Sequence, residues 1–348
     1  MSREQFGYLT DYYYYCKFLR DKFDITYIGF KANRPEIRLD GVRLKYVPWK
    51  GCLVSRFIRL IVGFVREGRK NYDLLFLMYF PGCSLFRLLT AGTRCILDIR
   101  TGSVAKSKIK RKADDLFMKF ETYFFRHITV ISQGLSDKLR LPKRKMHILP
   151  LGAEPIDTSP KKFDELHLLY VGTLDSRRIE DTIHGFEMFY KEFSNKIRTS
   201  YTIVGDGHND ELQMLRKLVW EKGLVDVVRL PGFIHRGRLR QYFERCDVGI
   251  SYVPINDIYD CQPPTKTFEY MFAGMPVIAT ATSENKRVIN RTNGILIRDN
   301  PESFYEALKE LYSRREEFYS EKIKHSYLNY SWERIVKKNL IPYLAKTV

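Results

Sequence analysis

The stretch that decides the fold is residues 262–280, which read QPPTKTFEYMFAGMPVIAT. Two prolines end a loop and allow a helix to begin directly after them, because proline fits only the first turn of a helix. Gly274 is suited to end that helix, and Val277–Ala279 is an apolar run typical of a buried parallel strand. Lys266 and Glu269 lie one helical turn apart on the same side. A cation and a carboxylate at a helix start beside a sheet suit a ligand with phosphates and hydroxyls.

The rest of the chain repeats this alternation of short apolar runs and longer amphipathic stretches, which predicts parallel sheets covered by helices. A length of 348 residues suits two domains, with a linker over Pro150–Glu165. Predicted strands of the first half lie near Ile25–Phe30, Arg43–Pro48, Leu74–Met78, Arg94–Ile99, Ile128–Ile131 and Met146–Leu149. Predicted strands of the second half lie near His167–Val171, Ser200–Val204, Val227–Leu230, Val248–Tyr252, Pro276–Ala279 and Gly294–Ile297. Predicted helices of the first half lie near Tyr8–Lys22, Val54–Glu67, Cys83–Ala91, Lys110–Phe125 and Gln133–Leu139.

Residues 262–280 resemble the donor-site segment of family 4 glycosyltransferases, which are retaining enzymes of the GT-B fold. The resemblance implies an α/β chain with two Rossmann-like, doubly wound parallel-sheet domains that face each other across a cleft. It implies an acceptor-binding domain over 1–150, a nucleotide-sugar-binding domain over 151–330, and a C-terminal helix over 331–348 that crosses back to the first domain. The first half begins on a predicted helix, so we expect its usual first strand to be lacking, with a true start upstream of Met1 as the alternative.

In the family, a glutamate on the helix of this segment holds the ribose of the nucleotide-sugar, and Glu269 takes that position. A second glutamate usually stands eight positions earlier, where this chain has Cys261. Asp257 and Asp260 both remain candidates for the missing carboxylate. The Pro-x-Lys-x-x-Glu-Tyr form therefore resembles a variant of the motif, with Lys266 as the expected phosphate contact and Thr265 beside it.

A second glycine turn follows the first strand of the second half, where residues 168–178 read LLYVGTLDSRR. Strand-to-helix turns present backbone N–H groups to anions, and arginine adds bidentate phosphate contacts. The family has an arginine and then a lysine here; Thr173 replaces the arginine, and Arg178 aligns with the lysine. Arg177 and Lys266 are the candidates to replace the missing charge. The alternative is a solvated helix start, which fits Arg177 better than Arg178. The expected donor-site residues of this turn are Gly172, Thr173, Arg177 and Arg178.

Two further segments resemble the family's donor domain. Residues 202–208 read TIVGDGH, a strand followed by Gly205 and Gly207, although tight-turn chemistry alone would also select these glycines. Residues 229–234 read RLPGFI, the segment that holds the nucleotide base in the family. Phe233 and Ile234 are therefore expected at the base, with a core position as the alternative for Phe233.

In the first half the resemblance is thin. Many family members carry a histidine after the fourth strand, and here residues 96–103 read ILDIRTGS. Asp98 and Arg100 are the nearest ionisable groups at that place. We expect either of them to position the acceptor hydroxyl or the diphosphate, with a helix-capping role as the alternative for Asp98.

The net charge of +18 is concentrated in the first half. Residues 1–150 contain 30 Lys and Arg against 13 Asp and Glu, whereas residues 151–348 contain 29 against 28. The cations cluster at 55–70 and 106–112, next to aromatic and aliphatic residues, a composition that suits an anionic lipid surface. The alternative is that the aromatic side chains pack against the sheet, which we expect for at least half of them. No signature of a nucleic-acid-binding module is present.

The sequence thus predicts a retaining hexosyltransferase that moves a sugar from a nucleotide-sugar to a lipid-linked or cell-surface polysaccharide precursor, a glycolipid or an oligosaccharide. Lys266, Arg178 and backbone amides would stabilise the departing nucleoside diphosphate without a metal or other cofactor. Six scattered cysteines indicate neither a zinc site nor a disulfide scaffold. No apolar run approaches the roughly 18 residues of a membrane span, so we expect a cytoplasmic protein, peripheral on the inner face of the membrane. The alternatives are a sugar-nucleotide epimerase of the same fold and an inactive partner subunit.

Overall fold

The computed structural model describes residues 9–31, 39–48, 52–207 and 210–347. Contacts divide the chain into two compact α/β units. Unit 1 consists of residues 1–151 together with 332–348, and unit 2 consists of residues 152–331. The segment before the first described helix lies outside the described residues, and the prediction of a missing first strand depends on that segment.

Unit 1 contains six described strands, all paired in parallel. Four of them form a sheet in the order β3-β4-β5-β6, and β1 and β2 pair with each other. Strand β4 reads RCILDI and is buried from its second residue onward, as expected for a central strand covered on both faces. The strands are β1 (Ile25–Lys31), β2 (Val42–Pro48), β3 (Leu74–Met78), β4 (Arg94–Ile99), β5 (His127–Val130) and β6 (Met146–Ile148).

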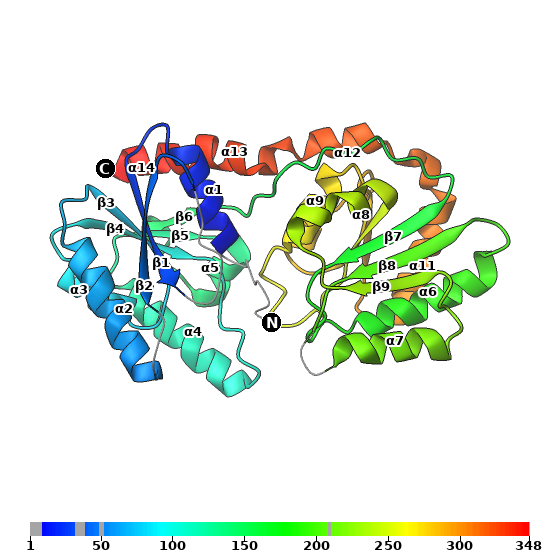
Figure 1. The fold of residues 1–348 in the computed structure, drawn as a ribbon, viewed down its shortest axis with the longest axis horizontal. Coiled ribbons are helices and arrows are strands. Elements are labelled where there is room, and N and C mark those ends of the chain that lie inside the picture. Colours follow the sequence, from blue (N-terminus) through cyan, green and yellow to red (C-terminus); the bar gives the residue numbers. More distant parts are fainter. Residues whose placement is uncertain (1–8, 32–38, 49–51, 208–209, 348) are drawn as a thin grey trace. The chain divides into compact units, whose positions relative to one another are not determined.

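Helices cover both faces of the four-stranded sheet (Figure 1). One layer is α2 (Leu53–Gly68), α3 (Cys83–Leu89) and α4 (Lys108–Thr122), in which α3 packs against both α2 and α4. On the other face, α1 (Leu9–Leu19) packs against the C-terminal segment. The remaining elements of unit 1 are α5 (Gln133–Leu139), α13 (Trp332–Ile335), the wide helical turn Val336–Leu340 and α14 (Ile341–Thr347).

Aromatic side chains hold the C-terminal segment in unit 1. Trp332 stacks on Tyr14 of α1 at 5.5 Å between ring centroids and meets Tyr15 edge-on at 5.7 Å. Tyr343 stacks on His147 of β6 at 4.2 Å. Contacts of this kind stabilise a helix end beyond simple burial, so the last described residues belong to the packed body of unit 1.

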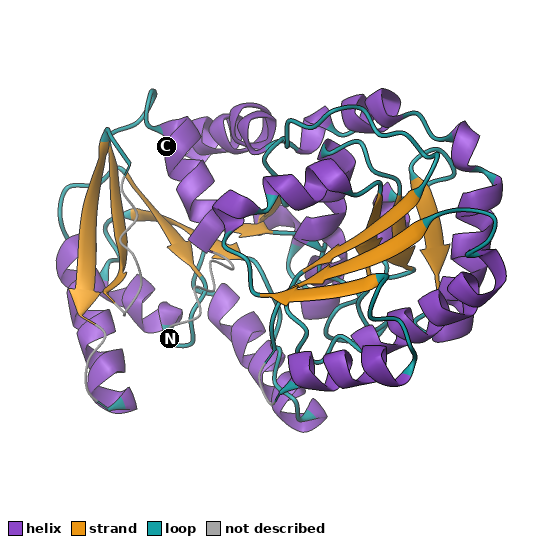
Figure 2. Cartoon of the chain, turned by 45° about the vertical axis from the view of Figure 1, so that its right-hand side comes forward, coloured by secondary structure: helices purple, strands orange, loops and turns teal. Residues whose placement is uncertain are grey.

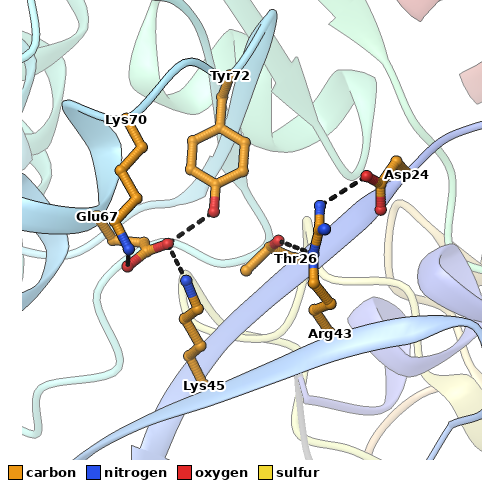
Figure 3. A network of polar contacts seen from close by, with 7 residues as sticks. All are labelled: Asp24, Thr26, Arg43, Lys45, Glu67, Lys70 and Tyr72. Carbon is orange, nitrogen blue, oxygen red and sulfur yellow. Dashed lines mark hydrogen bonds and ion pairs between the residues drawn. The ribbon is translucent and has the colours of Figure 1, made fainter.

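A carboxylate at the C-terminal end of α2 joins the β1–β2 pair to the helix layer (Figure 3). Glu67 accepts hydrogen bonds from Lys45 of β2, from Lys70 at 2.8 Å and from Tyr72 at 2.7 Å. Burial alone would raise the pKa of Glu67, but these three donors outweigh it and lower the pKa to about 2. Glu67 therefore stays ionised at neutral pH although its side chain is buried.

Unit 2 is built on a six-stranded parallel sheet in the order β12-β11-β10-β7-β8-β9. Figure 2 shows this sheet with helices on both of its faces. Its strands are β7 (Leu166–Val171), β8 (Thr199–Val204), β9 (Val228–Gly232), β10 (Val248–Ser251), β11 (Val277–Thr280) and β12 (Gly294–Ile297). Its helices are α6 (Ile179–Phe193), α7 (Glu211–Glu221), α8 (Arg240–Arg245), α9 (Thr265–Phe272), α10 (Asn285–Val288), α11 (Pro301–Ser313) and α12 (Ser320–Ser326).

The predicted strands and helices are confirmed within a few residues at their ends. The decisive stretch folds as expected: α9 begins at Thr265 directly after Pro264, and Gly274 follows the helix with φ of 71°. That left-handed conformation strongly favours glycine, and it turns the chain into β11. Within the described ranges, none of the helices is long and apolar enough to span a membrane.

Candidate functional site

Two glycine turns meet at the carboxyl edge of the unit 2 sheet. The N–H of Gly172, after β7, donates to the carbonyl of Val204, and the N–H of Gly205, after β8, donates to Gly232. A Cβ added to Gly205 would overlap the carbonyl oxygen of Gly172, so only glycine allows the two turns to approach this closely. Ligands of parallel α/β sheets bind at this edge, where helix N-termini and turn amides converge.

Lys266 places its ammonium group directly over the first of these turns. Its Nζ lies 3.8 Å from the ring centroid of Tyr170, and a Cβ on Gly172 would lie 2.8 Å from the same nitrogen. Among the described residues, no carboxylate forms an ion pair with this ammonium. Burial lowers the pKa of Lys266 well below its ordinary value, Arg177 lowers it further, and Glu269 partly opposes both. A bound anion would restore the charged form.

The two arginines of the same turn have different surroundings. Arg177 lays its guanidinium over the ring of Tyr259 at 4.0 Å, and its buried Nη1 has no hydrogen-bond partner among the described residues. Arg178 is exposed, has φ of 55°, and pairs with Asp181 at 2.8 Å and Asp299 at 3.6 Å. The structure therefore brings Arg177 next to Lys266, whereas Arg178 already has two carboxylate partners.

Glu269 lies one turn further along α9 than Lys266. Its Oε1 is 3.5 Å from Nη2 of Arg236, which follows β9. Burial raises the pKa of Glu269, Arg236 and Lys266 act to lower it, and Glu154 raises it. A carboxylate held this way can accept hydrogen bonds from hydroxyl groups, and it is separated by one helical turn from a cation that can face a phosphate.

The remaining predicted donor-site residues lie after neighbouring strands of the same sheet. Thr173 is exposed, and its carbonyl accepts a hydrogen bond from Tyr170 at 2.7 Å. Gly207 is buried in the turn after β8. Phe233 is 52% exposed just after β9, so the alternative of a core position does not apply to it. The other two members of the set are the half-buried Ile234 and the exposed Thr265, which is the first residue of α9.

The loop before α9 ties one of the two candidate carboxylates to the next loop. Asp260 accepts hydrogen bonds from the backbone N–H of Ser283 at 2.8 Å and from its hydroxyl at 2.6 Å. Asp257 is exposed, and Cys261 is buried. Asp260 thus fastens the loop that carries Tyr259 to the loop after β11.

Asp98 and Arg100 are buried inside unit 1. Asp98 accepts hydrogen bonds from Tyr12 and from Thr129, both at 2.7 Å. Arg100 pairs with Asp11 and donates to the carbonyl of Leu149 at 2.7 Å. Burial raises the pKa of Asp98, and Arg100 opposes it. These groups join α1 to the carboxyl edge of β4, so packing of α1 is the role that their contacts support.

One hollow of unit 2 lies elsewhere. It has a volume of about 1190 Å³ and is lined by His167, Arg198 and Arg245, among others, near the amino ends of β7 and β8. Parallel sheets bind ligands at the opposite edge, where the turn glycines and Lys266 lie. We therefore place the candidate site at the carboxyl edge of the sheet and not at this hollow.

Three site residues were not predicted from the sequence: Tyr170, Tyr259 and Arg236. Tyr170 lies inside an apolar strand and reads as a core residue. Tyr259 and Arg236 lie in loops without a motif, so only the folded chain reveals that they contact Arg177 and Glu269. An aromatic ring under a cation leaves no sequence signal, because the two partners come from different segments.

Residues 165–314 match the family model described as Glycosyl transferases group 1. No curated protein matches the chain significantly. Among solved structures, the chain is similar to Alr3699/HepE of Anabaena in complex with UDP, with a TM-score of 0.76 and 12% identity over 99% of this chain and 98% of that one.

Two other solved structures show the same likeness. Sucrose-phosphate synthase from Thermosynechococcus elongatus aligns with a TM-score of 0.70 and 18% identity over 95% of this chain and 91% of that one. The apo form of the lipopolysaccharide outer core galactosyltransferase WaaB aligns with a TM-score of 0.66 and 15% identity over 89% and 85%. The chain therefore has the GT-B fold, and the group 1 match across most of unit 2 supports a glycosyltransferase.

Proposed function

We propose that this protein is a retaining hexosyltransferase that uses a nucleotide-sugar donor. The observation that carries the proposal is the pair of cations at the carboxyl edge of the unit 2 sheet. Lys266 has no carboxylate partner among the described residues, and Arg177 has a buried nitrogen without a hydrogen-bond partner. Two such cations beside turn amides form a site for a diphosphate, and Glu269 one turn away is placed for the hydroxyls of a ribose.

The proposed chemistry needs stabilisation of a leaving group more than it needs a base. When the bond between the sugar and the diphosphate breaks, negative charge develops on the phosphate oxygens. Lys266 and Arg177, together with backbone N–H groups at Gly172 and the start of α9, would supply the opposing charge. We therefore propose that no metal ion is required, and that Arg177 replaces Arg178 as the partner of Lys266.

The proposed acceptor is a lipid-linked or cell-surface polysaccharide precursor, reached from the cytoplasmic face of the membrane. Two observations support this part of the proposal. The charge excess lies in the first half of the chain, and WaaB, one of the similar structures, is described as acting on the lipopolysaccharide outer core. The nucleotide-sugar part is supported by the complexes of Alr3699/HepE with UDP and with UDP-glucose.

Donor turnover tests the proposal directly. Purified protein is incubated with a panel of nucleotide-sugars, and release of nucleoside diphosphate is followed with and without a chelator. We expect slow release from one donor without acceptor, unaffected by the chelator, and retention of the anomeric configuration in the product seen by NMR. Interconversion of sugars would favour an epimerase, and neither binding nor turnover of any donor would favour an inactive partner subunit.

A further inference from the structure

Helix α4 exposes an apolar stripe on its outer face. Ile109 is 83% exposed, Leu116 is 68% exposed and Phe120 is 53% exposed, and the intervals of seven and four residues place all three on one side of the helix. The exposed residues Ala113, Phe117 and Tyr123 extend the stripe. We expected at least half of the aromatic residues near the cations to pack inward; in this cluster Phe125 is buried and Phe124 is half-buried, whereas Phe117, Phe120 and Tyr123 are exposed.

The negative and positive side chains of α4 lie on different faces of the helix. Its three carboxylates turn inward: Asp114 accepts from the hydroxyl of Ser103, Asp115 accepts from the N–H of Ser103, and the buried Glu121 accepts from Gly82 and Ser84. The exposed charged residues of the helix are all lysines, namely Lys108, Lys110 and Lys112. The outer face of α4 is therefore both apolar and cationic.

The neighbouring helices continue this surface. Gly82 and Ser84 donate hydrogen bonds to Glu121, which fixes the start of α3 against α4, and α3 packs against α2 on its other side. Figure 1 shows the three helices in one layer of unit 1. The exposed apolar residues of α2 and α3 are Ile58, Val62, Leu85, Leu88 and Leu89, and exposed cations of α2 are Arg59 and Arg66.

We propose that this surface, formed by the outer sides of α2, α3 and α4, binds the anionic headgroup layer of a lipid membrane. Apolar side chains enter the boundary between headgroups and acyl chains, and the surrounding cations meet lipid phosphates. A second copy of this chain would bring like charges together, which opposes self-association through the same face. This proposal rests on the proposed function, because an enzyme that acts on a lipid-linked acceptor must reach the membrane that holds it.

Vesicle sedimentation without any sugar donor tests the contact itself. The full chain is mixed with vesicles of phosphatidylglycerol and phosphatidylcholine in equal amounts, or of phosphatidylcholine alone. We expect binding to the first, weakened by sodium chloride, and little binding to the second. The double variant Leu116→Glu/Phe120→Glu should bind the anionic vesicles at least about tenfold more weakly, because it loses two buried apolar side chains and gains two negative charges.

A matched control lies in unit 2. Met214 and Trp220 of α7 are 58% and 72% exposed, so Met214→Glu/Trp220→Glu makes the same chemical change on another exposed helix. This control should bind vesicles like the original protein. Both variants should melt like the original and keep its thermal shift with the preferred nucleotide, which separates a failed contact from a failed fold or donor site.

Four outcomes would overturn the proposal. The first is absence of vesicle binding at low salt while the nucleotide shift remains. The second is equal loss of binding in the two double variants. The third is that single-stranded or duplex nucleic acid competes the protein off anionic vesicles and binds it more tightly than they do, which would assign the cations to a different polymer. A concentration-dependent dimer lost only in Leu116→Glu/Phe120→Glu would likewise assign the surface to a second copy.

Discussion

Helices α4 and α6 have the same length of 15 residues, but their phenylalanine side chains lie on opposite sides, exposed in α4 and buried in α6. In α6 the phenylalanines Phe186 and Phe189 are completely buried against the unit 2 sheet and its neighbours. In α4 Phe117 and Phe120 are about half exposed, and the carboxylates take the inner side. The comparison teaches that aromatic residues at helical spacing do not reveal which side of a helix is buried. Both helices also have buried carboxylates, Glu121 in α4 and Asp181 in α6, so what distinguishes the two is the side on which their aromatic residues lie.

The cations of the two units also differ in their surroundings. In unit 2, Lys266 lies over the turn at Gly172 and Arg177 lies in the loop that continues from this turn, which suits a small, doubly charged ligand. In unit 1, the lysines of α4 are spread over an outer face among apolar side chains, which suits an extended anionic surface. The two halves therefore have nearly equal counts of basic residues in different arrangements, and under our proposals these arrangements serve two kinds of binding.

Truncating one phenylalanine in each helix is the most severe test of the comparison. Phe186→Ala should lower the free energy of unfolding by about 3–5 kcal/mol, because it leaves a cavity in a fully packed core. Phe120→Ala should change it by no more than about 0.5 kcal/mol, because its side chain is half exposed. Urea unfolding of the two variants measures both values. Equal losses would mean that the aromatic stripe of α4 is a packed face.

Removing the cation over Gly172 should have the next largest effect. Lys266→Ala should lower turnover by about 10²–10³-fold, because the leaving diphosphate loses a charge held in a desolvated site. Lys217→Ala on α7, whose lysine is exposed and pairs with Glu221, should leave turnover unchanged. Steady-state rates with the preferred donor measure both. Full activity of Lys266→Ala would return this residue to an ordinary structural role.

The adjacent arginines offer a matched pair. Arg177→Ala should reduce donor binding or turnover by roughly tenfold to a hundredfold, the usual loss of a charge-assisted hydrogen bond. Arg178→Ala should reduce either quantity only a few-fold, because its guanidinium already pairs with Asp181 and Asp299. Titration calorimetry and rates distinguish binding from chemistry. The reverse order of effects would support the assignment made from the sequence, in which Arg178 aligns with the family's lysine.

The choice between Arg177 and Arg178 shows where sequence reasoning stopped. The strands and helices could be predicted because apolar runs, prolines and glycines mark their ends, as Pro264 and Gly274 do around α9. The direction in which the side chain of Arg178 points could not be predicted. It depends on the left-handed backbone conformation of Arg178, which non-glycine residues rarely adopt. The buried positions of Asp98 and Arg100 were equally hidden, since their partners come from α1, β5 and the chain after β6.

The smallest predicted effect concerns the inward carboxylate of α2, the counterpart of Glu121 on α4. Because the folded pKa of Glu67 is lowered to about 2, its ionised form contributes stability that is fully present above about pH 4.5 and lost as the pH falls toward 2. Glu67→Gln should therefore be less stable than the original protein by about 1–2 kcal/mol at neutral pH, with the difference shrinking in acid. Urea midpoints at several pH values measure it, with the exposed Glu302→Gln as the control. If the stability difference between Glu67→Gln and the original protein stays constant with pH, Glu67 acts through packing alone. Charge would then not explain why the acidic side chains of this helix layer turn inward.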